Sequence, residues 1–227
     1  MWAGARFWSA ITAVSRIRHL VATGCAAAVA ILLMCGVIPA QARAAAALNA
    51  ADQAKLAKVE DYLNTLRTIE SRFVQANPDG SYLEGKMYLQ RPGKLRFEYD
   101  APSPYLIVAS GSWFMYVDRE LGQPNYLPIE KTPAYFILRP KFEFGGDLRV
   151  TALLQGENVL QVELEQASEP DAGQVMLIFT ESPLALRKWR VIDSQGGLTD
   201  TTLINPRYGI PLADRLFEYQ APAPNSD

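Results

Sequence analysis

Cysteine and histidine are nearly missing from this chain, and the few that occur lie close to its start. The 227 residues contain two cysteines and one histidine, namely Cys25, Cys35 and His19. The sequence after them therefore excludes a disulfide framework, a thiol nucleophile, a Ser-His-Asp triad and a zinc site made of His and Cys. Because no spacing of Ser, Tyr, Lys or Asp favours catalysis either, we expect no enzyme activity, no cofactor and no metal.

The sequence also lacks a phosphate-binding loop and a basic surface. Neither GxxxxGK[ST] nor GxGxxG occurs. The formal net charge is −2, but residues 1–44 hold four arginines and no acid, which leaves 18 basic against 24 acidic residues, or −6, for the rest. A nucleic-acid-binding domain would instead show a basic stripe. We therefore expect no nucleic-acid partner.

The N-terminal segment has the features of a targeting sequence. Arginines precede an apolar run over residues 20–38, and the sequence at 40–44, AQARA, offers two small-x-small cleavage sites. We predict that residues 1–44 are a cleaved signal peptide and that residues 45–227 form a single exported domain. An uncleaved membrane anchor is the alternative, because the run is about long enough to span a bilayer.

One amphipathic helix is predicted at the start of this domain. Apolar residues at three- and four-residue spacing, Leu63 among them, predict a helix over residues 50–68. Asn49 is the expected N-cap, and Asp52 suits the positive end of the helix dipole. Such a helix packs on a core or covers a cavity.

Short strand-like runs separated by turn signals follow the helix. The predicted strands are residues 69–76, 81–90, 94–99, 105–109, 113–117, 148–154, 159–166, 174–180, 184–194 and 198–204, with 216–219 as a further candidate. Consecutive strands with short turns pair antiparallel. We therefore predict a mainly β fold with some α, an incomplete antiparallel β-barrel of about 11 strands with two helices on its concave side.

Two details of the later strands are specific enough to check. Residues 198–202 are polar on both sides, which favours an edge strand. Glu163 and Glu165 alternate with apolar residues, so we interpret them as a solvated outer face and not as a catalytic carboxylate pair.

A short helix is expected over residues 132–140, between two groups of strands. Thr132 is its expected N-cap, and Pro133 suits the first helical position. Its middle, residues 135–138, is apolar on every side. A helix of that kind fills a core or closes a cavity.

Arg91 is the one polar residue that the pattern singles out. It continues the apolar side of a strand that also carries Met87 and Leu89, and the next strand presents Leu95 and Phe97. One interpretation is that the arginine extends to water while its stem covers apolar surface. The other is that its N–H groups bind backbone carbonyls of the short helix and hold a lid over a cavity.

Several short motifs in order carry a family resemblance. They are Phe73-Val74-Gln75, Gly85, Leu89-Gln90-Arg91-Pro92-Gly93-Lys94, Tyr99-Asp100-Ala101-Pro102, Val108-Ala109-Ser110-Gly111 and Thr132-Pro133 before an apolar helix. Together with the signal segment and the strand count, they resemble LolA, the family of periplasmic outer-membrane lipoprotein carriers. The resemblance implies an unclosed barrel with a helical lid, in a periplasmic protein without a cofactor.

The resemblance also implies a function and binding partners. Members of the family take acylated lipoproteins from an inner-membrane ABC transporter, LolCDE, and hand them to an outer-membrane receptor, LolB. The implied protein is a chaperone that binds acyl chains in an apolar cavity, and we expect a monomer. The candidate ligand-binding residues are Arg91, Leu63, Met87, Leu89, Leu95, Phe97, Ile137 and Leu138.

Individual positions follow from the same resemblance. The family's lid-binding arginine corresponds to Arg91, and its lid residues correspond to Ile137 and Leu138. A wall aromatic of the family falls on Leu95, which is a departure, and the next one falls on Phe97.

Other functions fit the same predicted fold. The protein could carry or sense a free lipid or glycolipid, although a sensor resembling RseB would have a second domain, which we do not expect here. It could also be an inert β-domain with a filled core. Burial is worth about 0.8 kcal/mol per CH₂, so acyl chains leave a membrane only for an apolar hole. Carriage of acyl chains therefore predicts an apolar pocket that the protein's own side chains do not fill.

Overall fold

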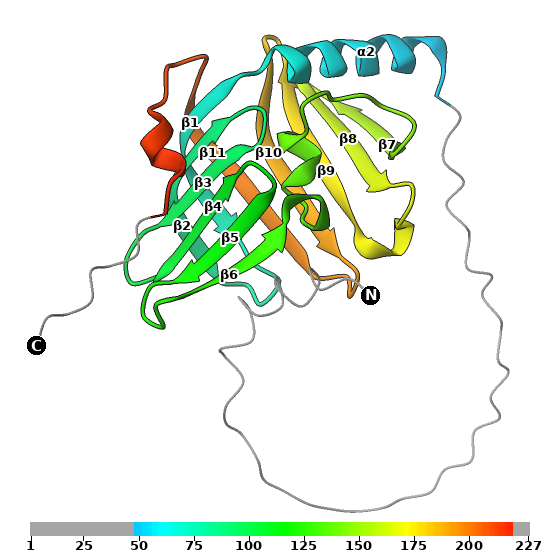
Figure 1. Ribbon diagram of the computed structural model, residues 1–227. Helices are drawn as coiled ribbons and strands as arrows, with labels where there is room; N and C mark the ends of the chain where they lie inside the picture. Colours follow the sequence, from blue (N-terminus) through cyan, green and yellow to red (C-terminus); the bar gives the residue numbers. More distant parts are fainter. Residues whose placement is uncertain (1–47, 220–227) are drawn as a thin grey trace, which may run out of the picture.

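The described part of the chain, residues 48–219 of a computed structural model, is one curved antiparallel sheet with a long helix across one end and short helices on both its concave and its convex side (Figure 1). The predicted signal peptide and the tail after residue 219 lie outside the described residues. The strands are β1 (Thr68–Ala76), β2 (Tyr82–Gln90), β3 (Lys94–Tyr99), β4 (Tyr105–Ser110), β5 (Trp113–Asp118), β6 (Gln123–Pro128), β7 (Leu148–Gly156), β8 (Val159–Gln166), β9 (Gly173–Glu181), β10 (Leu184–Asp193) and β11 (Leu198–Tyr208).

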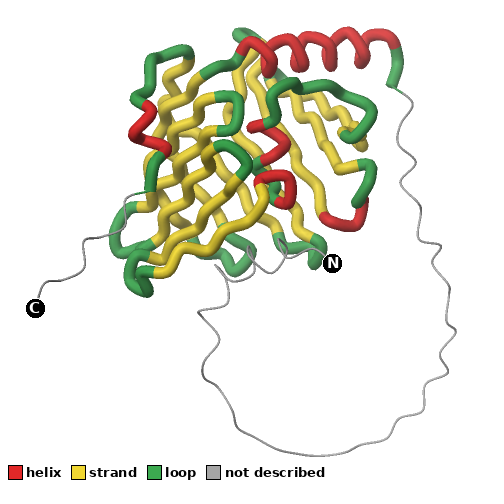
Figure 2. The backbone as a smooth tube through the Cα atoms, in the orientation of Figure 1, coloured by secondary structure: helices red, strands yellow, loops and turns green. Residues whose placement is uncertain are grey.

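The sheet is unclosed, as the sequence predicted. Its spatial order is β6-β5-β4-β3-β2-β1-β11-β10-β9-β8-β7, so every pair of neighbours is antiparallel and β6 and β7 are the free edges. β1 and β11 meet in the middle and join the two halves. Figure 2 shows the short helices η2 (Ile129–Lys131) and α3 (Tyr135–Leu138) between these halves.

Helix α2 (Ala50–Thr65) confirms the predicted first helix and its cap. The Asn49 side chain accepts the N–H of Asp52 at 3.0 Å, and Asp52 accepts the N–H of Asn49 at 3.3 Å, which forms a capping box. The helix ends three residues earlier than predicted, because Thr68 already pairs with Gln90 as the start of β1. Its buried side, Leu56, Val59 and Leu63, faces one end of the sheet. Among residues 48–219, no helix combines the length and the hydrophobicity needed to cross a membrane.

Gly85 is a motif position at which a larger residue would not fit. It lies opposite Phe73 across β1 and β2. A side chain at this position would collide with the Glu98 carbonyl oxygen and would lie 2.8 Å from the Phe73 ring. The glycine therefore lets Phe73 pack flat on the sheet, where it makes edge contacts with Phe97 and Tyr99.

Two strand predictions were wrong. Residues 198–202 do not form an edge, because β11 lies between β1 and β10 and its polar residues Thr199 and Thr201 face inward, buried. The true edge β6 was missed, because Pro124 and Pro128 interrupt its pattern. Proline is tolerated at such an edge because one side of the strand needs no hydrogen-bond donor.

Three local predictions also need correction. Residues 216–219 are not a strand, and 3₁₀ helix η4 (Asp214–Phe217) lies there instead. Thr132 does not cap α3, because its hydroxyl donates to the Ile129 carbonyl at 2.8 Å and so closes η2. Glu163 and Glu165 are buried, not solvated.

Side chains of β7 contact both glutamates across the β7–β8 pair. Thr151 donates to Glu163 at 2.8 Å, and Arg149 forms an ion pair with Glu165. Each of the two residues is only 7% exposed. Their neighbours therefore satisfy them structurally, and neither borders the interior cavity.

Candidate functional site

An apolar cavity lies between the concave face of the sheet and the segment around α3. Its lining residues come from eight strands and the α3 segment: Gln75, Leu89, Leu95, Phe97, Tyr99, Ile107, Phe114, Pro133, Ala134, Phe136, Ile137, Val175, Leu177, Trp189, Val191 and Thr201. None of these side chains is charged. Hydrocarbon is the material that such a wall accommodates, because it offers no partner to an ion.

The cavity is small in this closed arrangement. The space open to the centre of a water-sized sphere is about 60 Å³. A single water requires about 10–15 Å³ on this measure, so the cavity has room for only a few waters. The sequence predicts an apolar pocket that the protein's own side chains do not fill, and in the structure Phe136 and Ile137 reach the wall of that pocket and leave only this small space. A long chain can enter only if α3 moves.

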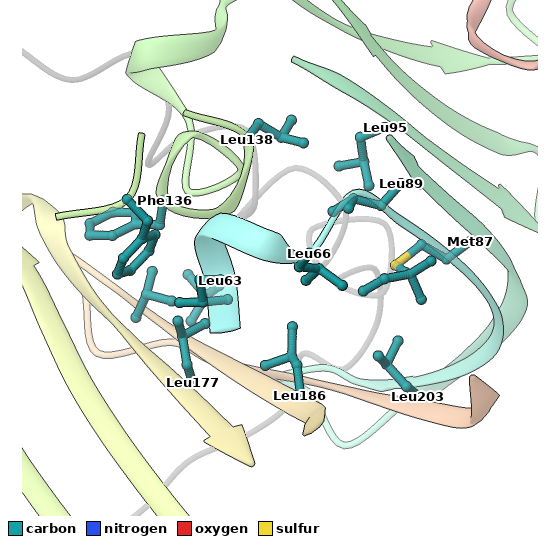
Figure 3. Close-up of a cluster of buried hydrophobic side chains, with 14 of the residues drawn as sticks. Leu63, Leu66, Met87, Leu89, Leu95, Phe136, Leu138, Leu177, Leu186 and Leu203 are labelled. Atoms are coloured by element: carbon teal, nitrogen blue, oxygen red, sulfur yellow. The ribbon is translucent and has the colours of Figure 1, made fainter. Parts of the chain in front are cut away.

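The structure divides the predicted site residues into two groups. Leu89, Leu95, Phe97 and Ile137 line the cavity. Leu63, Met87 and Leu138 are buried in the same apolar cluster but do not line the cavity in this form (Figure 3). Direct contact of this second group with a ligand stays a prediction, and it requires rearrangement of the core.

Arg91 lies at the end of α3. It is 6% exposed, and its Nη2 donates to the carbonyl of Arg139, the residue that ends α3, at 2.9 Å. Two residues further along, the N–H of Gly93 donates to the carbonyl of Leu138 at 2.9 Å. Two interpretations of Arg91 were open. In the structure its side chain contacts a backbone carbonyl at the end of α3 and does not extend to water. Its function as a lock stays a prediction.

The charge of Arg91 is poorly compensated. Burial, and secondarily the nearby Arg67, lower the pKa of Arg91 to about 10, so it remains a cation at neutral pH. Its Nε is buried without a hydrogen-bond partner among the described residues. A buried ion with too few partners costs free energy. Opening of α3 would hydrate this guanidinium, so the closed form is held by a contact that water can replace.

The chain after α3 is held to α2. Asn64 clamps Phe142 with two hydrogen bonds of 2.8 Å, one to its carbonyl and one from its N–H. Glu60 accepts the N–H of Phe144 at 2.9 Å. Arg139 itself pairs with Asp147 at 3.0 Å. The chain that follows α3 is therefore fastened to α2, next to the carbonyl contacts that Arg91 and Gly93 make at the end of α3.

The sequence analysis named only four of the cavity-lining residues as site residues. Among those that it missed, Trp189 and Val191 of β10 alternate with Lys188 and Arg190, whereas Val175 and Leu177 of β9 have apolar neighbours. The alternation in β10 was a usable signal. The polar wall residues Gln75 and Thr201 gave no such signal, because a polar residue in a strand usually faces water.

Comparisons with known proteins match the same region. A family model described as "Outer membrane lipoprotein carrier protein LolA" matches residues 64–220. An outer-membrane lipoprotein carrier protein of Methylococcus capsulatus is 31% identical over 179 residues, which cover 73% of this chain and 83% of that protein. One from Legionella pneumophila (strain Paris) is 29% identical over 173 residues, covering 72% and 84%.

Among solved structures, a LolA superfamily protein from Nitrosomonas europaea aligns with a TM-score of 0.41 and 11% identity, over 72% of this chain and 97% of that one. We base no conclusion on a structural similarity of that size. The residues matched by the family model include all those that line the cavity.

Proposed function

The chain belongs to the LolA family of outer-membrane lipoprotein carrier proteins, and we propose that it is a periplasmic chaperone that carries the acyl chains of lipoproteins to the outer membrane. The observation that carries this proposal is the uncharged cavity beneath α3. A lipid anchor requires such a wall once it leaves the bilayer. The protein would act by binding alone, as a monomer and without a cofactor.

A comparison of free energies supports the idea that binding of the cargo opens α3. Two hydrogen bonds, from Arg91 and Gly93, hold the end of α3. Together they are worth a few kcal/mol, at about 0.5–1.5 for a neutral bond and about 1.5–3 for a charged one. Transfer of a dozen methylenes from water into an apolar site gains about 10 kcal/mol. A ligand that binds only the open form can therefore shift the equilibrium toward it.

We propose the route from the family. An inner-membrane ABC transporter of the LolCDE type would load the carrier, and an outer-membrane receptor of the LolB type would unload it. Export would remove residues 1–44. The eight predicted site residues would then belong to the surface that the acyl chains touch once α3 has opened.

A displacement experiment tests the proposal. A dye that fluoresces in apolar surroundings is bound to the protein and then competed with a synthetic triacylated lipopeptide. We expect the lipopeptide to displace the dye, and the same peptide without acyl chains to leave it bound. Ile137→Glu should weaken lipopeptide binding at least about tenfold, because it brings a carboxylate to an apolar wall.

Leu121→Glu is the matched control. Leu121 is 75% exposed and does not line the cavity, so the same change there should leave binding unaltered. Equal displacement by the acylated and unacylated peptides would contradict the proposal. If mass spectrometry of the protein purified from its own envelope found free lipid or glycolipid and no lipoprotein, carriage of free lipid would replace it.

A further inference from the structure

One end of the cavity is polar, although the rest of its wall is apolar. Gln75 of β1, Tyr99 of β3 and Thr201 of β11 line this end. Gln75 lies directly opposite Thr201 in the β1–β11 ladder, and each is 1% exposed. β1 starts beside α2 and Gln75 is near its other end, so this polar group lies away from α2 along the sheet.

A chain of hydrogen bonds fixes the orientation of Gln75. Ser81 Oγ donates to the Asp79 carboxylate at 2.6 Å, because an ionised carboxylate can only accept. Ser81 Oγ then accepts from Asn77 Nδ2 at 3.0 Å, and Asn77 Oδ1 accepts from Gln75 Nε2 at 2.7 Å. Gln75 Oε1 is left to accept the Tyr99 hydroxyl at 2.8 Å. The amide of Gln75 thus keeps one of its two N–H donors unused.

Thr201 provides a second unused donor. Its hydroxyl makes no side-chain hydrogen bond with any residue of the described range. Buried hydroxyl groups in proteins nearly always have a partner. Since Thr201 borders the cavity, its partner must come from what the cavity contains.

The chemistry of these donors restricts that partner. Two neutral donors suit one neutral acceptor, whereas a phosphate or a carboxylate would call for arginine or lysine, and no charged side chain lines the cavity. Tyr99 stays a neutral donor, because burial raises its pKa far above the usual range. Within a lipid anchor, the carbonyls of the esters that join acyl chains to glycerol are neutral acceptors of this kind.

We propose that Thr201 and Gln75 form a subsite for the ester carbonyl of an acyl chain, whose hydrocarbon extends along the apolar wall toward α2. The inference rests on the proposed function, because it specifies which part of the cargo the cavity recognises. It also sets the direction of the chain: the ester lies at the end far from α2.

Two lipids that differ only in the ester test this subsite. Dioctanoylglycerol has two ester carbonyls, and 1,2-di-O-octylglycerol has ether oxygens in their place. Each is titrated against the dye-loaded protein. We expect the wild type to bind the ester about fivefold more tightly, the value of one neutral hydrogen bond. Thr201→Val keeps the branched shape but lacks the hydroxyl, and it should clearly reduce this preference, because the Gln75 N–H is then the only donor left at the subsite.

Thr199→Val is the matched control. Thr199 is on the same face of β11, is 5% exposed and does not line the cavity, so this variant should keep the preference for the ester. Thr201→Ala is a second hydroxyl deletion, which should repeat the result if the valine variant does not fold.

The outcomes separate the two proposals. If neither lipid displaces the dye, the proposed carrier function is wrong. If both lipids bind the wild type equally, or if both hydroxyl deletions keep the preference, the cavity still binds lipid but the ester subsite is wrong. In that case Thr201 pairs with water.

Discussion

Strands β4 and β5 are apolar on both faces, and the two faces are covered in different ways. On the concave face, Ile107 and Phe114 border the cavity beneath α3. Four residues form a separate buried cluster on the convex face: Leu106, Val108, Met115 and Val117. Tyr219 packs against this cluster, and η4 contacts β3 and β4. We call η4 together with Tyr219 the convex cover and the segment around α3 the concave cover. The convex cover packs directly on the strands, whereas the concave cover encloses a cavity.

Each cover is contacted by one arginine, which donates a hydrogen bond to a backbone carbonyl of that cover. Arg96 is part of β3, and Arg91 lies in the turn just before it. Arg91 binds the carbonyl of Arg139 at 2.9 Å on the concave side, and Arg96 binds the carbonyl of Leu216 at 3.3 Å on the convex side. Arg96 also pairs with Glu98 at 3.4 Å, so its charge is matched, but no carboxylate of residues 48–219 forms an ion pair with Arg91. We therefore expect the convex cover to contribute mainly to stability and the concave cover to be the one that opens.

The largest effect should come from the convex cover. Phe217 of η4 is 2% exposed, with the Lys94 ammonium 5.9 Å from its ring centre. Phe217→Ala should lower the free energy of unfolding by about 3–5 kcal/mol, the usual cost of an emptied aromatic site. The melting temperature should fall by about 6–20 °C. Urea and thermal unfolding followed by circular dichroism measure both.

Lipid binding by Phe217→Ala tests whether the convex and concave covers act independently. Below its melting temperature, Phe217→Ala should bind the acyl probe with unchanged affinity, because Phe217 does not line the cavity. A loss of affinity as large as that of Ile137→Glu would show that the two covers are coupled, and the division between them would be wrong.

Removal of the concave contact should change release and leave the fold intact. Arg91→Leu deletes a bond to the end of α3 but also removes a buried, poorly compensated ion, so stability should stay within about 1 kcal/mol of wild type. The open form gains relative to the closed form by the value of a charged hydrogen bond. Dissociation of a bound acyl probe should therefore slow by about tenfold or more.

Arg96→Leu is the matched control for that experiment. It removes the corresponding carbonyl contact on the convex side and should lower the melting temperature without altering the rate of probe release. Normal release by Arg91→Leu, with release slowed in Arg96→Leu, would reverse the assignment of the two covers.

The fold was predictable because its signals are local. The capping box at Asn49, the glycine at position 85 and the alternation of most strands are each decided by neighbouring residues. β6 was missed because Pro124 obscures its pattern, and only its position at the edge makes it a strand. The placement of β11 in the centre depends on pairing with β1, about 130 residues away, which no local pattern encodes.

The candidate site was predictable only in its apolar part. Parity along β2 and β3 correctly placed Leu89, Leu95 and Phe97 at the wall. The size of the cavity was not predictable, because it depends on how far Phe136 enters. The polar end was missed for a physical reason: the amide of Gln75 is satisfied by Asn77, in the turn that follows β1, and by Tyr99, from another strand.

The smallest effect should come from the surface ion pair that fastens η4. Asp214 accepts from Lys94 at 2.7 Å, and this bond lowers the pKa of Asp214 in the folded protein. A lowered carboxyl pKa stabilises the fold above the pKa of the unfolded chain, and the contribution is lost as the pH falls through the folded value. Asp214 is 74% exposed at its side chain, so solvent screens the pair.

Asp214→Asn should therefore unfold at a slightly lower urea concentration than wild type at pH 7 and at the same concentration in acid, below both pKa values. Urea titrations at the two pH values measure the difference. A large loss of stability at pH 7 would mean that charge, and not the burial of Phe217 and Tyr219, holds the convex cover. An altered rate of probe release would instead connect η4 to the cavity, which the separation of the two apolar clusters argues against.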